Sequence, residues 1–233
     1  MNIEICTDSV EGAIVAGKYG AKRIELCSSL SLGGLTPSYG LIEQCVAKTS
    51  IEVHVIIRHK EGGFQYNSSD VEIMKLDIKQ AKKAGATGVV FGILNNNYEI
   101  SDLNNELVSL AKRLDLEATF HRAFDFVNNY KKSLETIIFM GFDRLLSSGL
   151  SKTAEDGLDV ITELQNTYGL KIQIMAGSGI NYNNALKIAE SGINNIHFTA
   201  RKKMDEAHTK FSMGELMTTD EEKIKNIIGL FNS

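Results

Sequence analysis

Two glutamate–cysteine pairs lie near the start of the chain and share one spacing. Glu4 precedes Cys6 by two positions, and Glu25 precedes Cys27 by two positions. Thiolates are the ligands that copper(I) and other soft metals prefer. Closely spaced carboxylates and imidazoles can instead divide acid and base roles in catalysis. The repeated pair is therefore compatible with a soft-metal site and with an acid–base site.

The motif FHRAFD, residues 120–125, is a second segment with the residue types for chemistry. His121, Arg122 and Asp125 directly follow the apolar-leaning stretch 114–120, which predicts a buried strand. Ionisable groups at the end of such a strand are typical of a site at the carboxyl rim of a parallel barrel. An ion pair between Arg122 and Asp125 that only ties down a loop is the alternative.

The elements that must position these residues follow a regular alternation of strand-like and helix-like segments. Glycine often ends the helix-like segments, as expected for the left-handed residue that closes a helix. Eight strands are predicted, at residues 2–6, 23–27, 51–57, 88–92, 116–121, 143–147, 171–176 and 194–198. A helical segment is predicted after each strand, the last one beyond a long loop at about 201–218.

Eight strand–helix units without a linker predict a closed parallel barrel. The fold class is therefore α/β, a (β/α)8 TIM-type barrel in a single domain that spans residues 1–233. An open doubly wound sheet is the alternative. It would more often begin with a phosphate-binding glycine fingerprint, and CTDSVEG after the first strand is not one.

The alternation of residues along each strand predicts which side chains point into the barrel. Outward-facing residues pack against helices and should be apolar, so polar exceptions mark the interior. The polar or thiol-bearing residues with predicted inward positions include Glu4, Cys6, Glu25, Cys27, His54, Thr119, His121 and His197. A polar interior is costly unless its groups find hydrogen-bond partners. These side chains therefore predict a pocket at the carboxyl rim, although a single buried histidine is more often a satisfied core group.

An anion site is predicted where many barrels bind phosphate, after the seventh and eighth strands. Backbone N–H groups in glycine-rich turns can hold an anion there. The candidate anion-binding residues are Arg58, Arg122, Gly177, Ser178, Gly179 and Thr199. Glycines that only form a turn are the alternative.

Composition and charge argue against several classes of protein. A net charge of -4 gives no electrostatic reason to expect nucleic acid. No run approaches the ~18 apolar residues that a membrane span needs, and strand character from Asn2 onward argues against a signal peptide. Three cysteines cannot all pair with one another, which favours a reducing cytoplasm. A cytoplasmic protein without a nucleic-acid or membrane partner is therefore expected.

Several motifs together resemble one family, the CutC copper homeostasis proteins. The resemblance covers nearly the whole chain and runs through RIELCSSLSLGGLTPSYG (23–40), HVIIR (54–58), GVVFG (88–92), TFHRAFD (119–125), DRLLSSG (143–149), AGSGI (176–180) and IHFTA (196–200). It implies a TIM-type barrel, a cytoplasmic location, a homodimer and a role in copper tolerance. Copper(I) is the implied metal, and the implied ligands match Cys6 and Cys27. The chain departs from the family pattern at HKEGGF after the third strand and at Ser178, which replaces a glycine.

Three functional hypotheses remain open from the sequence. The first is copper homeostasis, with copper(I) bound by Cys6 and Cys27 and with His54 or His121 nearby. The second is a barrel enzyme of unknown reaction that acts on a small anionic metabolite, with Glu4, Glu25, His54 and His121 as catalytic candidates and Arg58 and Arg122 holding the anion. The third is a barrel retained for protein–protein contacts.

Overall fold

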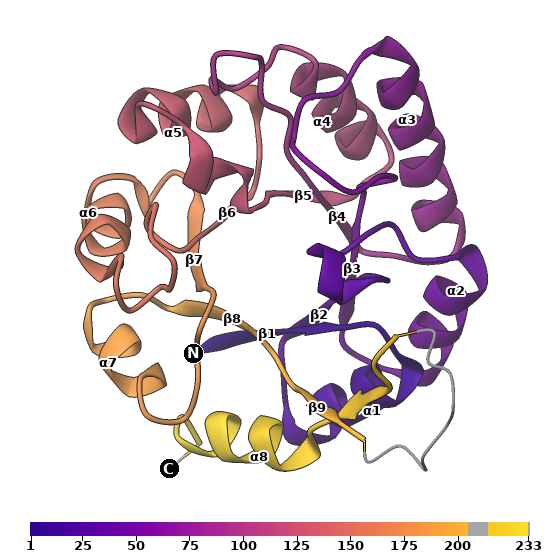
Figure 1. The fold of residues 1–233 in the computed structure, drawn as a ribbon, viewed down its shortest axis with the longest axis vertical. Helices are drawn as coiled ribbons and strands as arrows, with labels where there is room; N and C mark the ends of the chain where they lie inside the picture. The colour runs from indigo at the N-terminus through magenta and orange to yellow at the C-terminus, as the bar shows by residue number, and fades with distance from the viewer. Residues whose placement is uncertain (205–213, 233) are drawn as a thin grey trace.

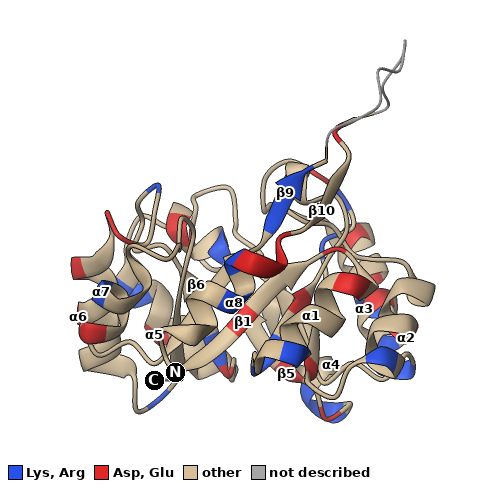
Figure 2. Ribbon diagram, turned by 90° about the horizontal axis from the view of Figure 1, so that it is seen from below, with Lys and Arg blue, Asp and Glu red and all other residues tan. Residues whose placement is uncertain are grey.

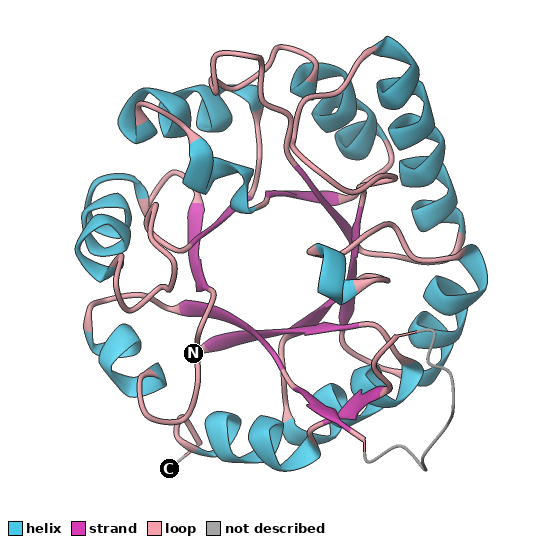
Figure 3. Ribbon diagram, in the orientation of Figure 1, coloured by secondary structure: helices cyan, strands magenta, loops and turns pink. Residues whose placement is uncertain are grey.

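The computed structural model describes residues 1–204 and 214–232, which form a closed parallel barrel ringed by helices (Figures 1 and 3). The barrel strands pair in chain order, and β1 closes the ring by pairing with β8. Their bounds are β1 Asn2–Thr7, β2 Arg23–Leu26, β3 Glu52–Ile56, β4 Gly88–Phe91, β5 Glu117–Phe120, β6 Arg144–Ser147, β7 Gln173–Gly177 and β8 Asn195–Thr199. The predicted (β/α)8 barrel is confirmed.

An α-helix follows every barrel strand in the described part of the chain. The helices are α1 Val10–Tyr19, α2 Tyr39–Lys48, α3 Ser68–Lys83, α4 Asn104–Arg113, α5 Tyr130–Met140, α6 Leu158–Tyr168, α7 Ala185–Glu190 and α8 Glu221–Gly229. Within the described residues, no helix has both the length and the apolar character needed to cross a membrane. Two short 3-10 helices, η1 (Leu30–Leu32) and η2 (Arg122–Phe126), lie in the loops after β2 and β5.

The segment predicted as one long loop at 201–218 contains a further pair of strands. β9 (Arg201–Lys203) pairs antiparallel with β10 (Met217–Thr219), so the loop prediction is wrong at both of its ends. β9 consists only of basic residues and projects above the barrel ring (Figure 2). Residues 205–213 of that predicted loop lie outside the described residues.

The outward faces of the barrel strands form the main hydrophobic core. Ile5, Ile24 and Val55 are buried between the barrel and its helices, as their alternation with polar residues predicts. Each fully buried aliphatic side chain of this kind stabilises the fold by roughly 1.5–3 kcal/mol. The apolar outer face therefore supplies the stability that allows the barrel interior to be polar.

Inward-facing glycines make room for the interior histidines. A Cβ atom at Gly88 would lie 2.6 Å from the ring of His54, and one at Gly92 would lie 2.8 Å from Nδ1 of His121. A Cβ at Gly177 would lie 3.3 Å from Cδ2 of His197. Real Cβ atoms do not approach ring atoms closer than about 3 Å, so at Gly88 and Gly92 any other residue would displace the imidazole.

We predict that Gly88→Ala destabilises the barrel by about 1–3 kcal/mol, because the new methyl group overlaps the buried ring of His54. Urea unfolding monitored by circular dichroism measures the change. Gly40→Ala is the matched control, because Gly40 lies in helix α2 with open space at its Cβ position. Alanine is favoured over glycine in a helix, so the control should be neutral or stabilising. Equal stability of Gly88→Ala and the wild type would contradict the packing argument.

Candidate functional site

A pocket of about 390 Å³ opens at the carboxyl ends of the barrel strands, where the sequence predicts the site. Cys6 of β1, Glu25 of β2 and His197 of β8 form part of its wall. Leu30 of η1 also lines the pocket, and in the view along the barrel η1 lies over the ring of strands (Figures 1 and 3). The volume falls within the range of roughly 300–1,000 Å³ that is usual for small-molecule sites.

The two rim cysteines lie next to each other in this structure. The Sγ atoms of Cys6 and Cys27 are 3.9 Å apart, and neither cysteine forms a disulfide. Both are buried in a small apolar cluster with Ile56, Val90 and Leu30. The contact with Cys27 and the burial both raise the pKa of the Cys6 thiol well above its usual value. Cys6 reaches the pocket wall, and Cys27 lies behind it.

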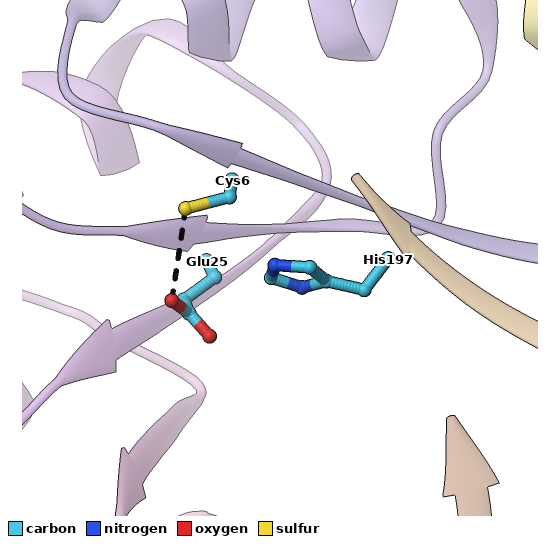
Figure 4. A group of neighbouring side chains, drawn as sticks. All are labelled: Cys6, Glu25 and His197. Carbon is cyan, nitrogen blue, oxygen red and sulfur yellow. Dashed lines mark hydrogen bonds between the residues drawn. The ribbon is translucent and has the colours of Figure 1, made fainter. Parts of the chain in front are cut away.

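A second group of potential ligands gathers around Cys6 (Figure 4). Ligand atoms of Cys6, Glu25 and His197 lie within 4.8 Å of one another, and the imidazole of His197 points toward the Cys6–Glu25 pair. Glu25 Oε1 is 3.7 Å from Cys6 Sγ, and Glu25 Oε2 is buried without a hydrogen-bond partner among the residues that the structure describes. Burial raises the pKa of Glu25 to about 7. The group therefore combines a thiol, a carboxyl and an imidazole at one point of the pocket.

Glu4 holds His197 in place across the β1–β8 pair, which closes the barrel. Glu4 and His197 are register partners on β1 and β8, and His197 Nδ1 lies 2.7 Å from Glu4 Oε1. Arg23 Nε donates to Glu4 Oε2 at 2.9 Å. Burial alone would raise the pKa of Glu4, but the His197 hydrogen bond and the charges of His197 and Arg23 outweigh it and lower that pKa to about 2. Burial likewise opposes protonation of His197, yet its hydrogen bonds to Cys6 and Glu4 raise its pKa well above the usual value.

His54 belongs to a different layer of the interior. Its Nδ1 lies 3.5 Å from Arg144 Nη1, and its Nε2 lies 3.6 Å from Glu117 Oε2. Burial lowers the pKa of His54 to about 4. Ligand atoms of Glu52, His54 and Glu117 also lie within 4.8 Å of one another. Arg144 already donates to Glu117, at 2.8 Å, so this layer holds ion pairs beneath the pocket.

His121 lines the pocket and packs against an aromatic side chain of the loop after β3. Its ring lies 4.9 Å from that of Phe64, and its Nδ1 accepts a hydrogen bond from the backbone N–H of Ala123 at 3.3 Å. Burial, followed by the charge of Arg58, lowers the pKa of His121 to about 3. His121 is therefore neutral near pH 7 and caps the helix η2.

The two arginines predicted to hold an anion are largely engaged in holding loops. Arg58 donates to the carbonyl oxygens of Leu32, Gly34 and Gly62 at 2.9–3.0 Å. Arg122 donates through Nε to Asp125, at 2.8 Å, and through Nη2 to Ser148 Oγ. The Arg122–Asp125 ion pair joins the loops after β5 and β6, because Asp125 also accepts from the backbone N–H of Ser148. Both arginines line the pocket.

The turn after β7 and the end of β8 also border the pocket. Ser178, Gly179 and Thr199 line it, and Gly177 lies under the ring of His197. Ser178 has a φ of +86°, an unfavourable conformation for a residue other than glycine, and its hydroxyl donates to Lys152 O at 2.9 Å. The hydrogen bond links Ser178 to the loop after β6.

Comparison with known proteins assigns the family. The CutC family model matches residues 1–202 of the chain. The chain belongs to the CutC family. A CutC family protein from Aliivibrio fischeri is 41% identical over 86% of this chain and 82% of its own length. A mouse protein named copper homeostasis protein cutC homolog is 40% identical over 96% of this chain and 84% of its own length.

Solved structures agree with this assignment. A CutC protein from Streptococcus agalactiae, named for copper homeostasis, superimposes with a TM-score of 0.77 at 31% identity, over 85% of this CutC chain and 98% of its own. An N-acetylmannosamine-6-phosphate 2-epimerase from Clostridium perfringens superimposes with a TM-score of 0.60 at 14% identity, over 85% and 86% of the two chains. The second likeness concerns the barrel fold alone.

Two ionisable residues that line the CutC pocket, His197 and Lys223, were not among the candidate site residues. His197 has an inward position on β8 that strand alternation predicts, but its proximity to Cys6 depends on barrel closure. Lys223 of α8 lines the pocket, and its Nζ donates to Thr199 O at 2.8 Å. Burial lowers the pKa of Lys223. No local motif marks this lysine, because it reaches the pocket from the last helix of the chain.

We predict that the stability of this CutC protein falls as the pH drops from 6.5 towards 3, in part through His121. The unfolded chain binds a proton at His121 below about pH 6.5, whereas the folded chain does so only near pH 3. Each such group removes up to about 1.4 kcal/mol per pH unit in this window. In His121→Asn, which keeps an acceptor for Ala123 N–H, the free energy of unfolding should fall less steeply. Chemical unfolding at pH 7.5 and 4.5 checks this, and identical slopes would contradict it.

Proposed function

We propose that the protein serves copper homeostasis by binding copper(I) through Cys6 and Cys27. The observation that carries this proposal is the 3.9 Å separation of the two Sγ atoms at the barrel mouth. Two metal–sulfur bonds of roughly 2.3 Å each could bridge that distance in a bent arrangement. Thiolates suit copper(I), and the two cysteines lie in a small apolar cluster with Ile56 and Val90.

The position of the two thiols supports a site that takes up and releases its ion from one side. Cys6 borders the pocket, whereas Cys27 is fully buried behind it. An ion would therefore arrive through the pocket and meet Cys6 first. Both thiols must lose a proton when the ion binds, so copper(I) binding releases protons and weakens as the pH falls.

We predict that the Cys6→Ser, Cys27→Ser double variant loses tight stoichiometric copper(I) binding, because a hydroxyl is a poor ligand for this soft ion. Anaerobic titration against a competing copper(I) chelator measures the affinity. Circular dichroism shows whether the variant is folded. Cys45→Ala is the matched control, since Cys45 is a buried thiol of α2 outside the pocket wall and its loss should leave copper(I) affinity unchanged. Wild-type affinity in the folded double variant would refute the proposal.

A second candidate function is catalysis on a small anionic metabolite in the same pocket. It is favoured by one observation, a cavity of about 390 Å³ in which acid–base groups and a lysine meet. Glu25 and His197 are the acid–base candidates that touch the cavity, and Glu4 orients His197. His121 is a further candidate in the wall, whereas His54 contacts the ion-pair layer.

The anion would contact the turn after β7 and the first turn of α8. Ser178 and Gly179 offer backbone N–H groups there, and Lys223 offers a cation. Arg58 and Arg122 would act mainly by holding the surrounding loops, since each already donates to several loop acceptors. Thr199 would contribute indirectly, because its carbonyl oxygen positions Lys223.

We predict that inorganic phosphate binds in this pocket and that Lys223→Gln weakens the binding at least about tenfold. The loss of one charge-assisted hydrogen bond accounts for this size of effect. Isothermal titration calorimetry measures the affinity. Lys225→Gln is the matched control, because Lys225 is an exposed lysine of the same helix outside this pocket. Equal phosphate affinity in both variants would argue against the anion site.

We further propose a cytoplasmic location and a homodimer, as the resemblance to CutC proteins implies. All three cysteines are free thiols, which is compatible with a reducing compartment.

A further inference from the structure

We propose that Cys6, Glu25 and His197 form a mononuclear site for a divalent metal ion of the zinc class, with one coordination position open to the pocket. This site differs from the copper(I) pair in its ligands and in the metal it selects. It shares Cys6 with that pair but uses Glu25 and His197 in place of Cys27. The two proposals can therefore fail separately.

The three side chains have the geometry of a preformed ligand set. Each offers one ligand atom, and these atoms lie within 4.8 Å of one another. Ligands bound to one ion at roughly 2.0–2.3 Å lie within that span. Glu25 Oε2 is buried and has no hydrogen-bond partner within the described residues, although an unpaired buried carboxylate oxygen is costly. The carboxyl group of Glu25 therefore keeps one oxygen available to a ligand.

The carboxylate of Glu4 holds His197 in the way that is usual for metal-binding histidines. A metal-bound imidazole commonly donates its other ring N–H to a carboxylate, which fixes the ring and its tautomer. Here Nδ1 of His197 lies 2.7 Å from Glu4 Oε1, which leaves Nε2 for an ion. Arg23 in turn holds Glu4 Oε2 at 2.9 Å. The imidazole is therefore oriented by a buried carboxylate that has its own cationic partner.

The ligand types and charges favour a divalent ion over copper(I). Binding of the ion would release the protons that Cys6 and His197 otherwise hold. The Cys6 thiolate and the Glu25 carboxylate then together neutralise a charge of +2, and a neutral His197 completes the set. A carboxylate is a hard ligand that zinc accepts and that copper(I) disfavours. Three protein ligands with an open fourth position are typical of catalytic rather than structural zinc sites. That open position would face the cavity, since all three residues line it.

Cobalt(II) is the spectroscopic probe for this site, because it takes the place of zinc and reports its ligands by absorption. We expect the wild-type protein to bind one cobalt(II) ion anaerobically. Its visible absorption bands should be as intense as those of four-coordinate cobalt(II), and a thiolate-to-cobalt charge-transfer band should appear in the near ultraviolet. Added zinc(II) should displace it. Glu25→Gln and His197→Asn should each lower zinc(II) affinity by more than the roughly 10–100-fold typical of changes around a metal site. Cys6→Ser should remove the thiolate band.

The variants are chosen so that the fold is retained. Glutamine has the shape of Glu25, and the amide of asparagine can still donate to Glu4 in place of Nδ1 of His197. Near-wild-type circular dichroism and melting temperature establish that each variant is folded. His59→Gln is the matched histidine control, because His59 contacts Asp70 outside the pocket wall and its loss should leave zinc(II) affinity unchanged.

Cys27→Ser separates this site from the copper(I) pair. If both proposals hold, this variant loses copper(I) binding and keeps cobalt(II) and zinc(II) binding. Failure of copper(I) binding in the wild type, with cobalt(II) bound as described, would overturn the copper proposal alone. No cobalt(II) binding, a spectrum without a thiolate band, or binding unaffected by Glu25→Gln and His197→Asn would overturn the zinc-class site.

Discussion

The buried ion pair between Arg23 and Glu4 is the interaction on which the polar interior depends. Both side chains are almost completely buried, and Glu4 also holds His197 across the seam where β1 meets β8. Removing one partner of such a pair typically costs about 3–5 kcal/mol, because the other charge stays buried and unpaired. The pair therefore links the closure of the barrel to the orientation of the imidazole that faces the pocket.

The interior is organised in layers. The lower layer holds charged and polar side chains that contact one another, and the upper layer holds the groups that a ligand can reach. Arg144, His54 and Glu117 pair with one another beneath the pocket. Above them, Cys6 and Glu25 border the cavity, and within the described part of the chain Glu25 Oε2 has no hydrogen-bond partner. The lower layer thus consists of groups that contact one another, whereas Cys6 and Glu25 are accessible to a ligand from the cavity.

The copper and zinc-class proposals place Cys6 at the meeting point of two ligand sets. Cys27 lies 3.9 Å from it on one side, and the carboxyl of Glu25 lies 3.7 Å from it on the other. A soft monovalent ion would favour the two sulfurs, and a borderline divalent ion would favour the mixed set. One thiol can thus serve either ion, and the neighbouring ligand decides which is preferred.

The sequence by itself determined the barrel and the inward positions of its polar residues, because a period of two along each strand assigns every side chain to a face. Glu4, Cys6, Glu25 and Cys27 follow from that rule alone. Only the tertiary structure decided which of them meet. His197 reaches Glu4 from 193 positions away because β8 closes on β1, and Lys223 enters the pocket from the last helix. Such contacts depend on strand register and helix packing, which no local pattern specifies.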